Sequence, residues 1–522
     1  ECPNEAIRIA QGATRLPDCR AYERVSPADS AGGVVGVDTQ NRPMFGAIRA
    51  DGNAAAFVSS SSVGEAERGG GFVSDNLARR TEGGWSSFSL LTTSEPSVPM
   101  DGSMSPAAPT PSSDMTRLMF VSPRSLGPPN PIASGGSVYL SAPEGKGPPT
   151  WLSRWSSAGT QPNPPAGRAL PLGGTHNLSS GYFSYPTPLT NIAGDNLRTS
   201  TYGLYFFKGS TVYPAGVLPS GTVSPQGALP AGTGVELSSN STSKVLPEMA
   251  RNQVSADGSK LFFISPGEGA EPKQLYVQEG ASPGRLISHD MLGNASTAGV
   301  ANLLDFDFPK PSDFAYATAG GSRVLFRSAS VLTADAPESG VKIYRAGITP
   351  SAITLTYLPV AGDVLAIDDD ASTILFGAPG SIAGTRSFYV WDEDRPADPY
   401  TVATDLPSTK LPMFEPTFSE DGSVLVFASG AEVEPGIAPP SEASYRQIYR
   451  WTKQDGPPVC ISCRRDGGMP GRFGAHMSNS PSIVTDNPAF PSGANPDPSN
   501  QSTVVDNRKI SSDGSRVFFD TN

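Results

Sequence analysis

A short motif recurs along the chain and restricts the possible folds more than any other feature of the sequence. In its full form it is Ser-x-Asp-Gly, followed by an apolar strand with Phe six residues after the Asp. Asp-Gly favours a tight turn, because Gly readily adopts positive φ and the Asp carboxylate accepts hydrogen bonds from nearby N–H groups. We therefore expect a β-hairpin at each copy. The full copies are Asp257 to Phe263, Asp421 to Phe427 and Asp513 to Phe519.

Five further copies keep the spacing of six residues but change the turn. They are Asp51 to Phe57, Asp114 to Phe120, Asn177 to Phe183, Gly320 to Phe326 and Asp370 to Phe376. Consecutive phenylalanines of the eight lie between 50 and 92 residues apart. Repeats of this length that are carried by strands indicate a propeller or a solenoid.

Each repeat also carries further short strands. A strand with a central tyrosine follows six of the phenylalanines, and the first repeat offers Asn76–Arg79 instead. A third strand follows that one, and another precedes each turn, so each repeat predicts one four-stranded antiparallel blade. The strand after the turn is apolar almost throughout, as in Lys260–Ile264, so it needs cover on both faces. Neighbouring blades would supply that cover. The tyrosines are Tyr139, Tyr205, Tyr276, Tyr344, Tyr389 and Tyr449.

The composition excludes several other classes of protein. The 56 glycines and 52 prolines in 522 residues are too many for a helical bundle or a coiled coil. The net charge of −12 argues against nucleic-acid binding, which needs a basic face. No run of 18 apolar residues is present, so we expect no membrane insertion.

We therefore predict an all-β fold, a single propeller of about eight four-stranded blades, with seven as the fallback. Residues 1–39 would form an N-terminal segment and residues 40–522 the propeller. The last repeat has only two strands before Asn522, so its blade is incomplete in this chain. Either Arg20–Val25, which reads like a tyrosine strand, closes the ring or more chain follows.

Over residues 40–521 the repeats resemble the WD40-like repeats of the TolB type. That pattern has a Ser-x-Asp-Gly turn, a strand ending in Phe and then an Ile-Tyr-Val-type strand. The opening, with Cys2-Pro-Asn-Glu and Pro17-Asp-Cys19-Arg-Ala-Tyr22, looks like the start of large exported propeller proteins of actinobacterial type. The resemblance implies a β-propeller and a binding role, and it does not imply an enzyme.

The four cysteines fall in two local pairs, Cys2 with Cys19 and Cys460 with Cys463. Clustered cysteines in a chain rich in Ser, Pro and Gly suit an exported protein with two disulfides, and the alternative is a cytosolic chain with four thiols. In an extended strand the Cα atoms of Cys460 and Cys463 would be about 10 Å apart, too far to bridge. The second disulfide therefore requires the chain to turn at Ser462. His476 follows this pair, but no fourth zinc ligand does, so we expect no zinc site.

No motif identifies a catalytic, cofactor-binding or metal-binding residue, so enzymatic activity stays open and we lean against it. The acidic run Asp368–Asp370 fits a blade turn with solvated acids better than a calcium site. The favoured function is a non-catalytic extracytoplasmic scaffold, which binds a protein or carbohydrate partner at the loop-bearing face around the central channel. The alternatives are a hydrolase or lyase of cell-wall glycan or peptide, and the accessory propeller of a larger peptidase. The longest connector, residues 464–501, is either a binding loop or an insertion.

Overall fold

The computed structural model describes most of the repeats and few of the long connectors. Within the parts that it describes, the only helix is α1 (Glu5–Ala10), and no helix is long and apolar enough to span a membrane. The described residues are 2–11, 14, 16, 19–26, 46–49, 51–59, 74–82, 84–89, 110–122, 137–143, 147–153, 169–185, 189, 203–224, 227–231, 253–265, 274–298, 315–360, 362–408, 413–435, 447–463, 475–477, 510, 511, 513–517 and 519–521.

The chain divides into two compact units. Unit 1 combines both ends of the chain with a central stretch and comprises residues 1–89, 361–496 and 507–522. Unit 2 is nearly continuous and comprises residues 90–360 and 497–506.

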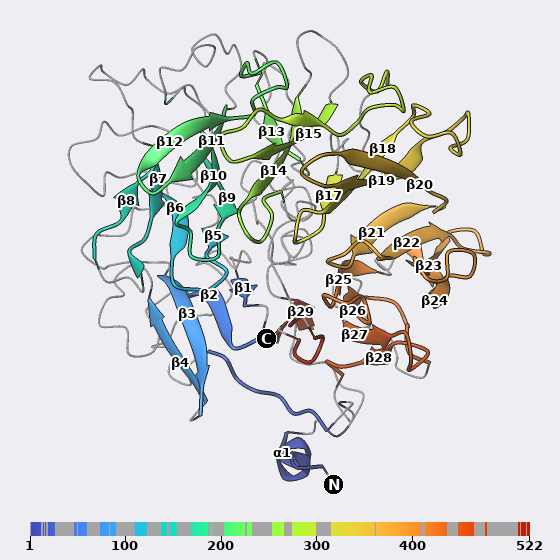
Figure 1. The fold of residues 1–522 in the computed structure, drawn as a ribbon. Helices are drawn as coiled ribbons and strands as arrows, with labels where there is room; N and C mark the ends of the chain where they lie inside the picture. The colour runs from blue at the N-terminus through green and yellow to red at the C-terminus, as the bar shows by residue number, and fades with distance from the viewer. Residues whose placement is uncertain are drawn as a thin grey trace, which may run out of the picture. The chain divides into compact units, whose positions relative to one another are not determined.

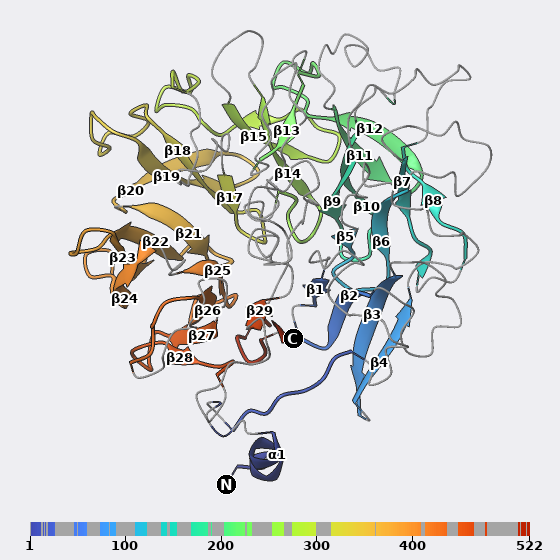
Figure 2. The same cartoon turned by 180° about the vertical axis from the view of Figure 1, so that it is seen from behind.

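Unit 2 contains four sheets, each of four antiparallel strands that pair in chain order. The sheets can be followed in Figure 1 and from behind in Figure 2. Their strands are β5 (Thr110–Pro111), β6 (Leu118–Ser122), β7 (Ser137–Leu140) and β8 (Thr150–Trp151); β9 (Leu170–Gly174), β10 (Ser180–Tyr185), β11 (Gly203–Lys208) and β12 (Thr211–Ala215); β13 (Leu229–Pro230), β14 (Lys260–Ser265), β15 (Gln274–Glu279) and β16 (Arg285–Leu286); and β17 (Ala315–Ala317), β18 (Arg323–Ser328), β19 (Lys342–Ile348) and β20 (Ile353–Leu358).

Unit 1 contains three sheets of the same kind and one sheet of two strands. The two-stranded sheet pairs β29 (Ala475–Met477) with β30 (Phe519–Thr521). The strands of the larger sheets are β1 (Gly46–Ile48), β2 (Ala54–Ser59), β3 (Ser74–Thr81) and β4 (Gly84–Ser89); β21 (Asp363–Ile367), β22 (Thr373–Pro379), β23 (Thr385–Asp392) and β24 (Tyr400–Pro407); and β25 (Phe414–Phe418), β26 (Val424–Ser429), β27 (Gln447–Thr452) and β28 (Val459–Cys460).

The chain is thus an all-β protein of the β-propeller class, built from four-stranded antiparallel blades as predicted. Among the described residues there are seven such blades, which is the fallback count rather than the favoured eight. The eighth repeat keeps its turn, flanked by a bridge between Ile510 and Val517. Its strand β30 then pairs with β29 from the preceding connector, whereas Arg20–Val25, the expected closing strand, forms no strand.

Phenylalanine and tyrosine of each repeat face each other across neighbouring strands in six of the seven blades. Phe263 of β14 is directly opposite Tyr276 of β15, and their rings stack with centroids 5.1 Å apart. In the first blade Phe57 faces Asn76 instead. Such cross-strand aromatic pairs each contribute about 0.2–1 kcal/mol relative to an alanine pair. The other pairs are Phe120 with Tyr139, Phe183 with Tyr205, Phe326 with Tyr344, Phe376 with Tyr389, and Phe427 with Tyr449.

Hydrophobic clusters join neighbouring blades within each unit. In unit 2, Phe262 and Ile264 of β14 belong to the same buried cluster as Phe326 and Tyr344 of the next blade. In unit 1, one cluster links the blades β21–β24 and β25–β28 in the same way. Apolar strands are therefore covered on both faces by packing between blades.

In most blades the longer connectors gather at one end. Because strands alternate in direction, the Asp turn after the first strand lies at the same end as the short hairpin after the third strand. The connector after the second strand and the link to the next blade lie at the other end, which we call the connector end. Residues 464–474 and 478–501 of the longest connector lie outside the described part of the chain.

Candidate functional site

The Asp turns share one hydrogen-bond pattern. In the turn of Asp421, Ser419 Oγ donates to Asp421 Oδ1 at 2.7 Å and the Ser423 N–H donates to the same oxygen at 3.0 Å. The Val424 N–H then donates to Ser419 Oγ at 3.0 Å. The turns of Asp114, Asp257 and Asp513 repeat these contacts, so their carboxylates are engaged inside the turn.

The turn hydrogen bonds favour the ionised carboxylates. Burial favours the protonated form of Asp513, but hydrogen bonds from Ser511 and Ser515 outweigh it and lower its pKa to about 2. Hydrogen bonds from Arg49 lower the pKa of Asp51 to about 2 as well. These carboxylates are therefore ionised members of the turns at neutral pH.

The sixth copy uses a different carboxylate from the one that the motif indicates. At Asp370 the spacing is kept, but Asp368 occupies the position of the serine. Its Oδ1 accepts from the Ser372 N–H at 2.9 Å and its Oδ2 accepts from Ser372 Oγ at 2.6 Å. Asp368 is almost fully buried, and this burial raises the pKa of the carboxyl despite the two hydrogen bonds.

Neighbouring turns contact each other within each unit. In unit 2 the Ala256 N–H donates to the Ala319 carbonyl at 2.7 Å, and in unit 1 the Asp369 N–H donates to the Glu420 carbonyl at 3.3 Å. Arg516 of the eighth repeat donates to the Asp51 carbonyl at 2.8 Å and to Asn53 Oδ1 at 2.7 Å. These last bonds connect the final repeat to the first.

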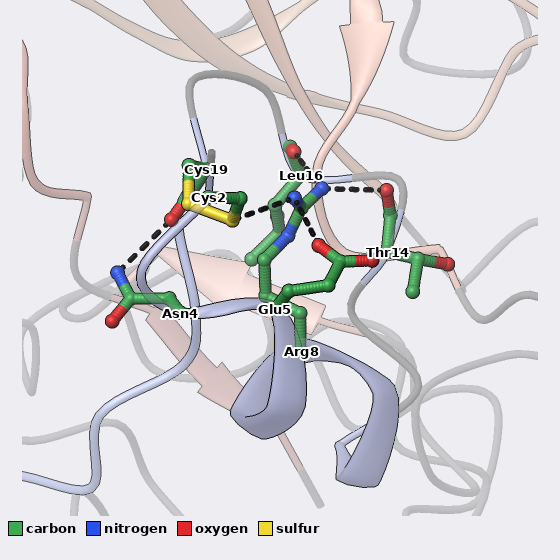
Figure 3. Close-up of a disulfide and its surroundings, with 7 residues drawn as sticks. All are labelled: Cys2, Asn4, Glu5, Arg8, Thr14, Leu16 and Cys19. Atoms are coloured by element: carbon green, nitrogen blue, oxygen red, sulfur yellow. Dashed lines mark hydrogen bonds and ion pairs between the residues drawn. A yellow bond between two sulfur atoms is a disulfide. The ribbon is translucent and has the colours of Figure 1, made fainter.

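The Cys2–Cys19 disulfide is present and encloses α1 (Figure 3). Its loop is organised around Arg8, whose guanidinium donates to the carbonyls of Thr14 and Leu16 at 2.7 and 2.8 Å and to Glu5 at 3.0 Å. The Arg8 side chain is only 11% exposed, so the guanidinium takes part in the fold of this segment.

The Cys460–Cys463 disulfide is also present, with a Cα–Cα distance of 5.7 Å, so the chain turns within this segment as expected. Both cysteines are buried in the cluster between the last two complete blades of unit 1. The described residues contain no group of three or more His, Cys, Asp or Glu that could hold a metal ion.

The N-terminal segment contacts the blades β25–β28 and β1–β4 of unit 1 through side chains. Tyr22 Oη donates to the Ile461 carbonyl at 2.9 Å, inside the second disulfide loop. Glu23 forms an ion pair with Arg80 of β3 at 3.1 Å. Figures 1 and 2 both show this blue segment running from the end of β28 toward β3.

The described connector ends carry exposed aliphatic side chains on well-ordered loops. In unit 2 the connector after β16 forms a small hairpin, with Met291 and Leu292 at its tip, 71% and 86% exposed. Asp290 Oδ1 fixes this tip by accepting from the N–H groups of Leu292 and Asn294, both at 2.8 Å. The buried Gln274 of β15 holds the base by donating to the Ser296 carbonyl at 2.8 Å.

The neighbouring loop of unit 2, residues 329–341, is held in a similar way. Tyr344 Oη donates to the Ser330 carbonyl at 2.7 Å and accepts from the Leu332 N–H at 3.0 Å. Leu332 is buried in the core, whereas Val331 and Val341 are 39% and 50% exposed.

The two loops are joined through hydroxyl groups at their bases. Ser330 Oγ accepts from the Ala298 N–H at 2.9 Å and lies 3.1 Å from Thr297 Oγ1. The buried Ser296 Oγ lies 2.9 Å from Ser328 Oγ. We call residues 287–298 and 329–341 together the aliphatic loop pair.

In the described part of unit 1, a comparable loop lies between β22 and β23. Asp405 accepts from the Ser381 N–H at 2.6 Å and from Thr385 Oγ1 at 3.1 Å. The loop displays Ile382, which is 61% exposed. The repeat motif gave no indication of these aliphatic tips, because an exposed Leu or Ile in a connector looks like any other apolar residue in the sequence.

No protein-family model matches this chain, and no curated protein matches it. Solved structures similar to it include the β-propeller domain of the Trilobed protease from Pyrococcus furiosus, at 9% identity and a TM-score of 0.36, covering 80% of this chain and 97% of that one. One of two prolyl endopeptidases is similar at 12% identity and a TM-score of 0.39, over 80% of this chain and 49% of that enzyme, so this chain spans about half of its length. A putative TolB from Agrobacterium tumefaciens is similar at 11% identity and a TM-score of 0.24, over 53% of this chain and 79% of that one.

Proposed function

We propose that this chain is an extracytoplasmic, non-catalytic propeller that binds a protein or carbohydrate partner through the connector ends of its blades. The observation that supports this most is the contrast between the Asp-turn end and the connector end of the blades. The Asp turns use their polar groups internally, whereas the connector ends display Met291, Leu292 and Ile382 on loops fixed by hydrogen bonds. Apolar side chains that are exposed together mark interaction surfaces, and loops that are already ordered lose little entropy on binding.

The extracytoplasmic location is supported by the two disulfides, which persist in oxidising compartments and are rare in the cytosol. Alkylation of the protein recovered from its source cell, followed by mass spectrometry, tests this point. We expect all four cysteines to resist alkylation until a reductant is added. Four freely alkylated thiols would place the protein in a reducing compartment.

Binding is tested with the whole chain as bait, against an envelope extract and on a glycan array. We expect one arm to show enrichment over heat-unfolded bait. A triple variant, Met291→Ser, Leu292→Ser and Ile382→Ser, should lose most of this enrichment. Lys208→Ser, an exposed change in the hairpin between β11 and β12 at the Asp-turn end, serves as the matched control and should retain it.

Absence of enrichment in both arms would contradict the proposal, as would equal loss in the two variants. Cleavage of cell-wall glycan or peptide by the purified chain would favour the hydrolase or lyase alternative instead.

A further inference from the structure

The aliphatic loop pair has a chemical character that narrows the class of partner. Its residues include three acids, Asp290, Asp335 and Glu338, and contain no lysine or arginine. The nearest cation along the chain, Lys342, directs its ammonium to the Ala329 carbonyl at 2.7 Å and is 2% exposed. The surface is therefore both aliphatic and acidic.

The loop pair is also poorly suited to carbohydrate. Sugar rings are commonly held by stacking on aromatic side chains, and residues 287–298 and 329–341 contain no Phe, Tyr or Trp. The exposed side chains are instead Met291, Leu292, Val331 and Val341. Burying such side chains against apolar side chains of a partner is favourable, which favours a protein as the partner.

The loops are ordered before any partner arrives. Asp290, Gln274 and Tyr344 fix the backbone on either side of the exposed side chains. Little conformational entropy would be lost on binding, so the surface is prepared for docking.

We infer that the aliphatic loop pair docks a protein segment that is apolar and basic, with aliphatic side chains against Met291 and Leu292 and Lys or Arg facing Asp335 and Glu338. This inference rests on the proposed binding function and assigns the partner of this loop pair to protein rather than carbohydrate. The positive charge of the segment follows from charge complementarity with Asp335 and Glu338, because the Asp290 carboxylate is engaged within its own loop.

The test uses a fluorescein-labelled 16-residue amphipathic peptide of Leu and Lys, measured by fluorescence anisotropy against the full chain. Two control peptides replace every Lys with Glu or every Leu with Ser. We expect the Leu/Lys peptide to bind at least tenfold more tightly than either control. Met291→Ser with Leu292→Ser should weaken its binding at least tenfold.

Two further variants separate docking from general attraction to an acidic protein. Asp335→Asn with Glu338→Gln should weaken binding about threefold and reduce its dependence on salt. Ile9→Ser, a comparably exposed aliphatic change on α1 of unit 1 and outside the proposed binding surface, should leave binding unchanged. All substituted side chains are exposed, and thermal melts will verify that each variant is folded.

Equal binding by the native chain and the Met291→Ser, Leu292→Ser variant would overturn the inference, as would equal binding of the three peptides. Either result would leave the enrichment from envelope extract unaffected. Failure of that enrichment would instead remove the binding function itself, so the two failures are distinguishable.

Discussion

Every Asp turn has a residue with positive φ at its fourth position, and three of these residues are not glycine. Met115, Leu178 and Ala371 adopt φ of 55°, 52° and 52°. This conformation costs an L-residue about 1–2 kcal/mol. Met115 and Leu178 are buried apolar side chains, so hydrophobic burial offsets part of that cost. Ala371 buries only one methyl group.

The glycine requirement can be tested by exchanging the two residue types between adjacent turns. A Cβ at Gly422 would lie 2.5 Å from Thr373 Oγ1 and 2.9 Å from Asp368 Oδ2, and the backbone there has φ of +65°. We expect Gly422→Ala to lower the free energy of unfolding by about 2–4 kcal/mol, through strain and overpacking. Ala371→Gly should remain within about 1 kcal/mol of the native chain. Urea titration measures the free energy of unfolding of both variants. Equal losses in the two would contradict the requirement for glycine at position 422.

The turn carboxylates predict opposite responses to acid. The pKa of Asp513 is lowered in the folded state, so its stabilisation is present above the unfolded value of about 3.9 and disappears as the pH falls toward 2. The pKa of Asp368 is raised, so its contribution is complete below about 3.9 and is lost as the pH rises through the folded value.

We therefore expect Asp368→Ser, which restores the residue type of the other turns, to gain stability relative to the native chain between pH 3 and pH 7. Asp513→Asn should show the reverse trend, with its cost greatest at pH 7 and absent near pH 2. Thermal melts across this range measure both slopes. If the stability of both variants, relative to the native chain, changed with pH in the same direction, the opposite pKa shifts of Asp368 and Asp513 would be contradicted.

At the scale of the elements, the N-terminal segment takes the place that a closing strand was expected to fill. A strand was expected at Arg20–Val25 because Tyr22 lies near its centre, like the tyrosines of the strands that follow the repeat phenylalanines. In the structure it forms side-chain contacts to Ile461 and Arg80 rather than a ladder of backbone bonds. Residue pattern alone does not distinguish these two uses of a tyrosine.

Loss of the Tyr22 hydroxyl should loosen this segment. Tyr22→Phe removes the hydrogen bond to the Ile461 carbonyl, and we expect a loss of about 1 kcal/mol. The N-terminal segment should then be cut faster by trypsin at Arg20 or Arg24 than in the native chain. Tyr213→Phe, in β12 of unit 2, is the control and should leave the cleavage rate unchanged. Equal rates in all three proteins would show that the contact does not hold the segment.

The sequence predicted the blades well because the repeat encodes them locally. Asp-to-Phe spacing determines the turn, and the following tyrosine determines the register, as in Phe263 and Tyr276. The blade count could not be obtained in the same way, because the eighth repeat has the same turn, yet its strand β30 pairs with β29 of the preceding connector. The exposed tip at Met291 and Leu292 could not be predicted either, since it depends on where Asp290 and Gln274 fix the loop.

At the scale of the whole chain, unit 1 depends on contacts between its two ends. Arg516 bonds to Asp51 and Asn53, more than 460 residues away along the chain. Ile510 and Val517 pack with Val424 and Leu16 in one cluster. Both ends of the chain are therefore required for a complete unit 1.

Removal of residues 507–522 should destabilise unit 1 far more than the single change Arg516→Ala. We expect Arg516→Ala to cost about 1–2 kcal/mol, through the lost hydrogen bonds. The truncated chain should expose additional amides of β1–β4 and β25–β28 to hydrogen exchange, while β13–β20 remain protected. Uniform loss of protection in both units would contradict the division of the chain.

The interleaved order of the two units has a consequence for synthesis on the ribosome. Nearly all of unit 2 emerges as one continuous stretch, so its blades can pack while translation continues. The first blade emerges earlier but has to wait for Arg516 and its neighbours, which are translated after all of unit 2. During that interval the nascent chain presents the strands of β1–β4 without their partners, which makes this blade the part most in need of a chaperone.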